Sequence, residues 1–585
     1  MTSTVTKDSE PVRQQPDGSS EVPPEGGSPR WQALLERYGT TRWLARLLEF
    51  LALVPAAALT IEVSKAPELH FVDYWYALVR FVNLDGGLNI GGLFKASNEH
   101  LIAIPSLLYY GDATIFGGNQ RILGYADVLI AIATVVLIRF AIPKTLPPVV
   151  RASIVLMSSA LIFSLHGLHN FTHAMSGAAW LTANLISVGA LLFAVKGKWW
   201  PAWGMALLGS ITYGTAFAVW PSIALIAIMR KEPMWRRILP LAAGAVIVVG
   251  WMSVNHNAAG SGTESDLGTA IFGLLAVIGH IWAADNTGFA VLAGAVILGG
   301  YAAMATVKAA RAPELRFWWA LGCHGFFGSA MIAISRIDFG LDYSQHSRYT
   351  SVSVLMSLPL LVLVGTVVHT FAARHWRKLA VAFVVAGITG FALGVPTAES
   401  VRAEDTDHEI ESVALRAGYL NAFGWALPPA GHQLVPRLEA LGHYPFNDDF
   451  TLGCGGPELG DTIDLAGVKR IVPPEGGRTP ASPAGTVDKV DAKPGSQLVW
   501  GWATGVKDPV RCTVLVDSTG KVVGGGVSDR VRSDIAQRYL GINADTGFGM
   551  VGPDDPDLRV VVILESGAKR WMPAKVSDDT DEDQK

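Results

Sequence analysis

Long apolar stretches alternate with short polar connections over the first 400 or so residues of the chain. A helix that crosses a lipid bilayer needs about 20 mostly apolar residues. About eleven stretches approach or reach that length, and we expect each to be a transmembrane helix. They cover residues 43–64, 123–141, 151–168, 175–196, 200–214, 216–230, 236–253, 288–308, 316–335, 350–372 and 378–396. The pattern predicts a mainly α polytopic membrane protein.

Basic residues mark every second connection between these stretches. The connection after the second predicted helix, for example, contains Arg139, Lys144 and Arg151. Because positively charged short loops remain in the cytosol, the pattern predicts a multi-pass protein of the plasma membrane with a cytosolic N-terminus and an extracytoplasmic C-terminal domain. One further apolar stretch, 268–284, would break the alternation if it crossed the bilayer. We therefore expect it to form a re-entrant or interfacial helix on the outer side.

Changes in composition along the chain predict five regions. Residues from about 498 to 565 contain short β-branched runs separated by turn residues, which is typical of a small antiparallel sandwich. The first 40 residues are too polar to form a packed core. The predicted regions are a disordered cytosolic tail (1–40), a transmembrane domain (41–397) with a long first outer loop (65–122), an exported helical region and linker (398–490), a C-terminal all-β sandwich (491–575) and an acidic disordered tail (576–585).

Composition and charge exclude other classes of protein. Half of the residues are hydrophobic and only 16% are charged, as expected for a chain embedded in a bilayer. The 46 basic and 50 acidic residues give a net charge of −4, so a nucleic-acid partner is not expected. The 3 cysteines are too few for a disulfide-dense scaffold. Cys454 and Cys512 are both predicted outside the cytosol, where a disulfide between them can form; two free thiols are the alternative.

Ionisable side chains gather at the predicted outer ends of the spans. Such groups are costly near a membrane core unless they serve a site or a pathway. Asp73 lies shortly after the first span, in the aromatic segment 71–78. The other candidates in the outer segments are Asn98, Glu99, His100, His169, Arg336, Arg348 and Tyr349. The order and common side of these groups predict one functional site outside the cytosol.

This arrangement resembles the GT-C superfamily of polytopic glycosyltransferases. The resemblance covers residues 43–397 and rests on the topology, Asp73 in the first outer loop, the segments NEH (98–100) and FGG (116–118), and the SRY segment (347–349). It implies a polyprenyl-phosphate-linked sugar as donor and an exported polysaccharide or cell-wall glycan as acceptor. Close relatives often carry two adjacent acids in the first loop, whereas this chain has Val72 before Asp73. The C-terminal pattern looks like β-sandwich modules attached to such enzymes.

The resemblance and the chemistry of the reaction suggest a role for each candidate. A hydroxyl acceptor needs a base, and Asp73 is the expected catalytic base. Arg348 can hold two phosphate oxygens through its planar guanidinium. One carboxylate and direct attack imply inversion at the anomeric carbon. Arg336 and Tyr349 are expected to help bind the donor phosphate. The residues expected to position the acceptor are Asn98, Glu99, His100 and His169. Glu99 and His100 could also complete a weak Mg²⁺ or Mn²⁺ site, and no other cofactor is expected.

Structural roles are the alternatives for single residues: a helix cap for Asp73, a snorkelling side chain for Arg348 and a hydrogen-bonded loop histidine for His100. For the whole chain, a transporter or flippase of lipid-linked glycans is one alternative. A transporter would need charged residues along a complete pathway, and many transporters contain an internal repeat. The sequence has no evident repeat. A membrane-anchored glycan-binding assembly protein is the other alternative, although about eleven spans exceed what anchoring needs.

Overall fold

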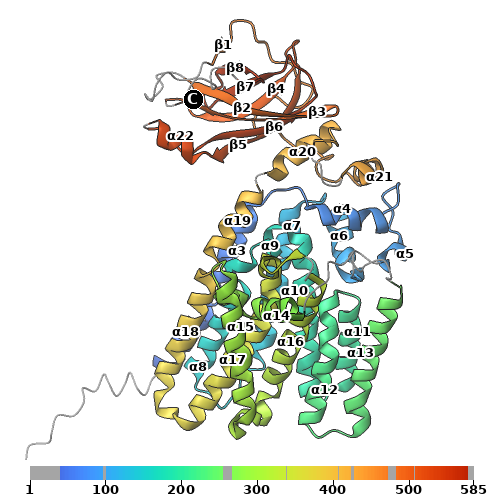
Figure 1. Ribbon diagram of the computed structural model, residues 1–585, viewed down its shortest axis with the longest axis vertical. Coiled ribbons are helices and arrows are strands. Elements are labelled where there is room, and N and C mark those ends of the chain that lie inside the picture. The colour runs from blue at the N-terminus through green and yellow to red at the C-terminus, as the bar shows by residue number, and fades with distance from the viewer. Residues whose placement is uncertain are drawn as a thin grey trace, which may run out of the picture.

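The computed structural model describes residues 40–95, 100–254, 267–336, 339–405, 407–422, 427–471, 483–505, 507–539 and 541–576. The chain is mostly helical, at 63%, and has a separate C-terminal β-sheet. Figure 1 shows a helical bundle at one end of the molecule and the sheet at the other. Helices α20 (Asp407–Ala417) and α21 (Leu427–Leu441) lie between them. The predicted tails lie almost entirely outside the described residues.

Within the described residues, nine helical segments are long and apolar enough to cross a membrane. They correspond to nine of the predicted spans, which is consistent with a multi-pass membrane protein. The segments contain α2 and α3 (Thr40–Leu51, Val54–Lys65), α7 (Gln120–Arg139), α8 (Pro148–Ile162), α10 (Ala174–Val195), α13 (Met234–Val254), α15 (Thr287–Thr306), α16 (Arg316–Arg336), α17 (Thr350–Phe371), and α18 and α19 (Trp376–Ala392, Val395–Asp405), which continue toward α20.

The two other predicted spans are shorter helices. Helix α11 (Trp199–Ser210) has 12 residues, and the short helix η2 (Gly214–Ala218) leads into α12 (Val219–Met229) of 11 residues. Each is shorter than the roughly 20 residues of a full span. The stretch expected to be re-entrant or interfacial contains α14 (Leu267–Gly279), also a short apolar helix.

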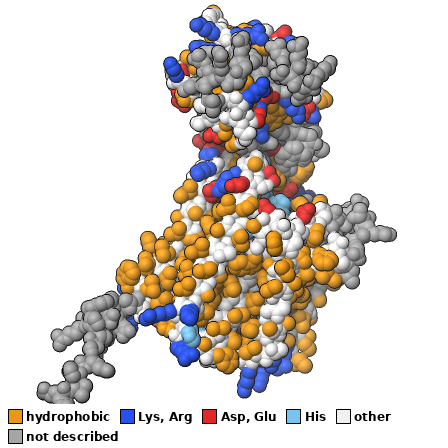
Figure 2. Space-filling view, turned by 60° about the vertical axis from the view of Figure 1, so that its left-hand side comes forward, with side chains coloured by type: hydrophobic (Ala, Val, Ile, Leu, Met, Phe, Trp, Pro, Cys, Tyr) orange, Lys and Arg blue, Asp and Glu red, His pale blue; other side chains and the backbone are white. Residues whose placement is uncertain are grey.

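The outer surface of the bundle is apolar. Hydrophobic side chains cover the helical part in Figure 2, and Lys and Arg side chains gather at the end away from the β-sheet. Leu129, Val246 and Val296 are each at least 65% exposed. Large apolar side chains exposed in this number are typical of a surface that meets another apolar phase, as a lipid bilayer would provide.

The loop 65–122, predicted to be the first outer loop, packs over the upper end of the bundle (Figure 1). It contains α4 (Val72–Phe81), α5 (Ile90–Leu93) and α6 (Ala103–Ile115). Tyr74 and Leu78 of α4 share a hydrophobic cluster with Leu434 and Leu438 of α21. The loop is therefore held from above by the chain that follows the last apolar helix.

The C-terminal strands form one curled eight-stranded sheet in the described chain, in the order β1-β8-β7-β4-β5-β6-β3-β2. Neighbouring strands are antiparallel except for the parallel pair β1 and β8. The strands are β1 (Lys469–Arg470), β2 (Ala484–Lys493), β3 (Ser496–Thr504), β4 (Val510–Val516), β5 (Val522–Val531), β6 (Asp545–Gly552), β7 (Arg559–Leu564) and β8 (Lys569–Pro573).

Helix α20 covers one face of this sheet. Val514 and Val516 of β4 share a cluster with Ile410 and Val413 of α20, whereas Leu515 packs into a cluster on the opposite face. The alternation follows from the two-residue period of a strand. One residue separates α20 from α19 at the end of the bundle. Because α20 packs on the sheet, this short connection attaches the sheet closely to the helical bundle.

Strand β2 lies across the boundary predicted between the linker (398–490) and the β domain (491–575). The strand was not apparent from the sequence because it lies at the edge of the sheet and its second half is mostly charged or partly exposed. Strand β6 was also missed, since it contains three glycines. At Gly549 a Cβ atom would lie 2.2 Å from the ring of Trp500, so that glycine makes room for a side chain of the neighbouring strand.

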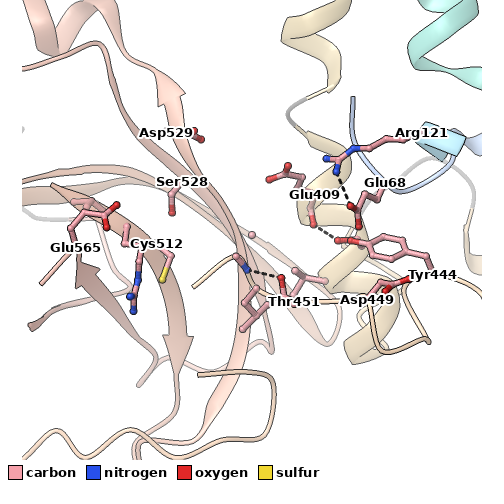
Figure 3. A pocket seen from close by; sticks show the side chains of 17 residues that line it. Glu68, Arg121, Glu409, Tyr444, Asp449, Thr451, Cys512, Ser528, Asp529 and Glu565 are labelled. Carbon is pink, nitrogen blue, oxygen red and sulfur yellow. Dashed lines mark hydrogen bonds and ion pairs between the residues drawn. The ribbon is translucent and has the colours of Figure 1, made fainter. Parts of the chain in front are cut away.

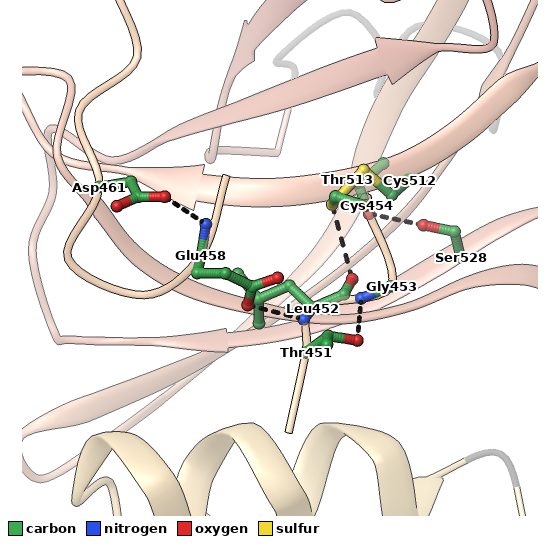
Figure 4. The surroundings of a disulfide bond; sticks show 9 residues. All are labelled: Thr451, Leu452, Gly453, Cys454, Glu458, Asp461, Cys512, Thr513 and Ser528. Carbon is green, nitrogen blue, oxygen red and sulfur yellow. Dashed lines mark hydrogen bonds between the residues drawn. A yellow bond between two sulfur atoms is a disulfide. The ribbon is translucent and has the colours of Figure 1, made fainter. Parts of the chain in front are cut away.

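A disulfide joins Cys454 to Cys512 of β4, with 5.2 Å between the Cα atoms (Figure 4). It ties the segment before the sheet to a central strand. The cysteines are 58 residues apart, and closing a loop of this length stabilises a folded domain by about 4 kcal/mol in the chain-entropy account. The remaining cysteine, Cys323, is free in α16.

Replacing both Cys454 and Cys512 with serine should therefore loosen the β-sheet. We expect backbone amides of β4 and β7 to exchange with deuterium faster in the double variant than in the parent protein, measured by mass spectrometry on the full chain. Cys323→Ala is the control, because it leaves the disulfide in place. Unchanged protection in the double variant would contradict a stabilising role for the bond.

Candidate functional site

Asp73 lies in the first turn of α4. The helix begins after Phe71, whose backbone is extended, and Asp73 is partly buried. A carboxylate in a first turn is stabilised by the positive end of the helix dipole. The local sequence thus explains why an acid is tolerated here, beside the cavity that this turn lines.

Asp73 lines a cavity of about 50 Å³, which we call the Asp73 pocket. The pocket brings together segments that are far apart in the sequence. Of the predicted site residues, it is lined by Asp73, His100, His169, Arg336 and Arg348, together with aromatic residues that include Trp180 and Tyr213. Tyr349 is buried beside it and lines a neighbouring cavity. Asn98 and Glu99 lie outside the described residues.

Arg348 is held in place by its neighbours but keeps a free donor. One terminal nitrogen of its guanidinium donates to the hydroxyl of Tyr343 over 2.7 Å. The guanidinium also lies over the rings of Tyr343 and Tyr349, at 5.9 and 5.7 Å. Its buried Nε atom has no acceptor in the described chain. A fixed arginine with an unused N–H is suited to an anionic ligand.

The backbone of the SRY segment is fixed to the histidine-rich turn. The hydroxyl of Ser347 donates to the carbonyl of His166 over 2.5 Å and accepts from the backbone N–H of His169 over 3.2 Å. The side-chain amide of Asn170 donates to the carbonyl of Arg348 over 3.0 Å. The turn around residues 166–173 therefore positions Arg348.

Two histidines that line the pocket, His100 and His169, are neutral at neutral pH. Burial, followed by the charges of Arg336 and Arg348, lowers the pKa of His100 to about 3. Burial also lowers the pKa of His169 well below its usual value, and the Nδ1 atom of this ring has no partner in the described chain. Asp73 is thus accompanied by two permanently charged arginines, which leaves the pocket positive and favours an anion.

An apolar cavity of about 320 Å³ adjoins the Asp73 pocket. The two cavities share His100, Trp180, Tyr213 and Arg336 as lining residues. The additional lining is largely apolar and includes Phe217, Val248, Trp251, Met331 and Ile334. Arg336 therefore lies at the junction of a charged pocket and an apolar cavity, an arrangement that fits an amphipathic ligand with an anionic group.

The described residues contain no group of three or more His, Cys, Asp or Glu side chains that could hold a metal ion. The expected Mg²⁺ or Mn²⁺ site depends on Glu99, which lies outside the described residues. The donors that can be assessed around Asp73 do not fit a bound divalent ion, since His100 is accompanied by two arginines. We therefore derive no chemical step through a metal.

Comparisons with protein-family models, curated proteins and solved structures found no match to this chain. The geometry of the pocket is consequently the basis for a functional assignment.

Sequence reasoning missed the contacts of Tyr74, the residue that follows Asp73 in α4. The hydroxyl of Tyr74 lies 3.1 Å from Nε2 of His443, and the Nδ1 atom of His443 lies 2.6 Å from the carbonyl oxygen of Tyr444. Since a carbonyl only accepts, Nδ1 carries the proton and Nε2 accepts from Tyr74. His70 stacks on Tyr74, with ring centroids 3.7 Å apart, and pairs with Asp112 over 2.9 Å. The aromatic segment 71–78 and the acid Asp112 were the signals of this cluster in the sequence.

Proposed function

We propose that the chain is a membrane glycosyltransferase that moves a sugar from a polyprenyl-phosphate carrier to a hydroxyl of an exported polysaccharide or cell-wall glycan. The observation that supports this proposal is the junction of the two cavities. Asp73 and two arginines line a charged pocket, and Arg336 continues into an apolar cavity. A polyprenyl phosphate has the same division, with an anionic group beside an apolar chain.

The proposed reaction is a single displacement. Asp73 accepts the proton of the acceptor hydroxyl while the hydroxyl oxygen bonds to the anomeric carbon of the sugar. The bond from that carbon to the phosphate oxygen breaks, and the polyprenyl phosphate leaves with the electron pair. Arg348 holds the phosphate oxygens, with Arg336 beside it at the entrance to the apolar cavity. Direct attack inverts the configuration of the anomeric carbon.

The wider architecture is part of the same proposal. The chain has a GT-C-like membrane domain with eleven crossings, in which α11 and the η2–α12 segment complete the nine longer segments. The N-terminus is cytosolic, and the sheet is a β-sandwich module outside the cytosol. The location of Lys and Arg side chains at the end of the bundle away from the sheet (Figure 2) supports this orientation.

The direct test is transfer by the full chain reconstituted in lipid vesicles. Polyprenyl-phosphate sugars carrying a radioactive label are supplied with a panel of glycan acceptors, and labelled glycan is measured. We expect a labelled product with inverted anomeric configuration. Movement of the carrier across the bilayer without formation of a glycosidic bond would overturn the proposal in favour of a transporter.

The arginines provide a prediction about donor binding. Arg348→Gln should raise the KM for the polyprenyl-phosphate sugar by about 10- to 100-fold, since a hydrogen bond to a charged group contributes about 1.5–3 kcal/mol. Arg336→Gln should act in the same direction. Arg374→Gln is the control, because Arg374 is exposed and lies outside both cavities. Unchanged kinetics in both pocket variants would contradict phosphate binding at this position.

A further inference from the structure

A third cavity, separate from the Asp73 pocket and from the apolar cavity beside it, lies where the β-sheet meets the helical part of the molecule (Figure 3). We call it the interface pocket. Its volume is about 460 Å³, within the range of roughly 300–1,000 Å³ that is usual for ligand sites. It is lined by Glu68 and Arg121 from the helical part, by Glu409 of α20, and by residues of the sheet that include Asp529. The two pockets share no lining residue.

The lining combines acceptors and donors of hydrogen bonds. Carboxylates of Glu409, Asp529 and Glu565 supply acceptors, and Arg511 supplies N–H donors. The Nε atom of Arg511 is buried and has no acceptor in the described chain. Serine, threonine and tyrosine hydroxyls of the lining can serve in both ways. Such a lining can bind a ligand that carries many hydroxyl groups, since each hydroxyl both donates and accepts.

Asp529 has a backbone conformation that supports a binding role. Its φ is +74°, in the left-handed region that side chains other than glycine rarely adopt. It lies where the register between β5 and β6 shifts, between Ser528 and Arg530. Burial, followed by the charge of Asp545, raises the pKa of its carboxyl group. Strained residues of this kind are frequent at binding sites.

The carboxylates do not indicate a cation site. They come from separate elements, and within the described residues no three of them form a group that could hold a metal ion. Arg121, which pairs with Glu68 over 2.7 Å, and Arg511 also place positive charge in the lining. A neutral ligand with many hydroxyls fits this mixture of charges better than a cation.

The interface pocket is separated from the Asp73 pocket by a thin layer of rings. The ring of His408 lies 5.8 Å from that of Phe71 and 5.3 Å from that of His173, and both of these residues line the Asp73 pocket. The next residue, Glu409, lines the interface pocket. The two pockets therefore lie close together, on either side of residues 408 and 409.

From these observations we infer that the interface pocket binds a neutral oligosaccharide, the part of the acceptor glycan that lies behind its reacting hydroxyl. The role of this oligosaccharide as an acceptor rests on the proposed glycosyl transfer. Its binding can be measured without any transfer. It assigns the helical bundle and the β-sheet a shared ligand, which neither part could bind alone.

The test uses the full chain in lipid nanodiscs and an array of neutral gluco-, manno-, galacto- and arabino-oligosaccharides of three to eight units. The oligosaccharide bound best is then titrated by calorimetry against pocket variants. Asp529→Asn, Glu409→Gln and Arg511→Gln should each weaken binding by about 10-fold or more, as expected for a lost hydrogen bond to a charged group. Asp554→Asn, at an exposed acid of the same domain, should leave the Kd unchanged.

Two results would overturn the inference: no binding to any oligosaccharide of the array, or binding that none of the pocket variants weakens. Glu565→Gln is a further pocket variant, at an exposed acid of the lining, and it should also weaken oligosaccharide binding. Because Glu565 is exposed, this loss would not be due to a folding defect. Asp73→Asn separates the two proposals. It should retain oligosaccharide binding while transfer is lost. Pocket-dependent binding by a parent protein that transfers no sugar would uphold this site and overturn the proposed function.

Discussion

Asp73→Asn should lower the rate of sugar transfer by about 10²- to 10⁴-fold, the usual contribution of a general base. The amide keeps the size of the side chain and its position in the first turn of α4, but it cannot accept the proton of the acceptor hydroxyl. Donor binding should change little, because the arginines of the pocket remain. The measurement is kcat for the reconstituted protein with saturating polyprenyl-phosphate sugar.

Asp85→Asn is the matched control for this experiment. Asp85 is an exposed acid of the same outer loop, and its carboxylate accepts from the backbone N–H of Gly87 over 3.0 Å. The amide oxygen of asparagine can keep this hydrogen bond, so transfer should remain at the parent rate. Full activity of the Asp73→Asn variant would contradict the role of Asp73 as the catalytic base.

Gly118→Ala should weaken the contact between the segment around His443 and the loop 65–122. Gly118 has a φ of +70°, and a Cβ atom there would lie 2.0 Å from Nε2 of His443. The histidine cannot give way easily, because it is fully buried and bonded to Tyr74 and to the Tyr444 carbonyl. The left-handed conformation alone costs alanine about 1–3 kcal/mol, and the overlap adds to this cost. We expect lower thermal stability and faster proteolysis near α21.

Gly111→Ala provides the comparison. Gly111 lies inside α6 of the same loop, and a Cβ atom there would have no atom within 4 Å. Alanine should be tolerated or slightly stabilising, since it favours a helix more than glycine does. Adding His443→Ala to Gly118→Ala removes the overlapping ring and should recover part of the stability. Equal stability of the two glycine variants would contradict the contact with His443.

The membrane helices could be predicted because their signal is local. Nine of the predicted spans match long apolar segments in the described chain, since a run of about 20 mostly apolar residues is typical of a transmembrane helix. The shorter helices α11 and α12 pack beside longer neighbours, and hydropathy alone does not set their length. The expectation that Asp73 and Arg348 lie on one side followed from counting spans, and both residues line the Asp73 pocket.

The supporting contacts could not be predicted because they join distant parts of the chain. Tyr74 and His443 are 369 residues apart. The hydrophobic pattern around each residue does not predict that they are in contact. The sequence showed the FGG segment as a motif but not why it contains Gly118. The structure explains this glycine, because the ring of His443 occupies the space that a side chain at residue 118 would need. Strand β6 was hidden for a similar reason: Gly549 makes room for Trp500, and glycines lack the β-branched side chains by which strands are recognised.

The contact between Tyr74 and His443 also has a consequence for biosynthesis. Among the described residues, His443 follows all nine segments that could cross a membrane, so the ribosome makes it after these segments have been synthesised. In the proposed orientation, the segment around His443 must then cross the bilayer and fold before α4 is supported on both sides. If Asp73 is the base of the proposed transfer, a nascent chain that is only partly inserted would have an unfinished reaction centre, and it would not consume lipid-linked sugars before assembly is complete.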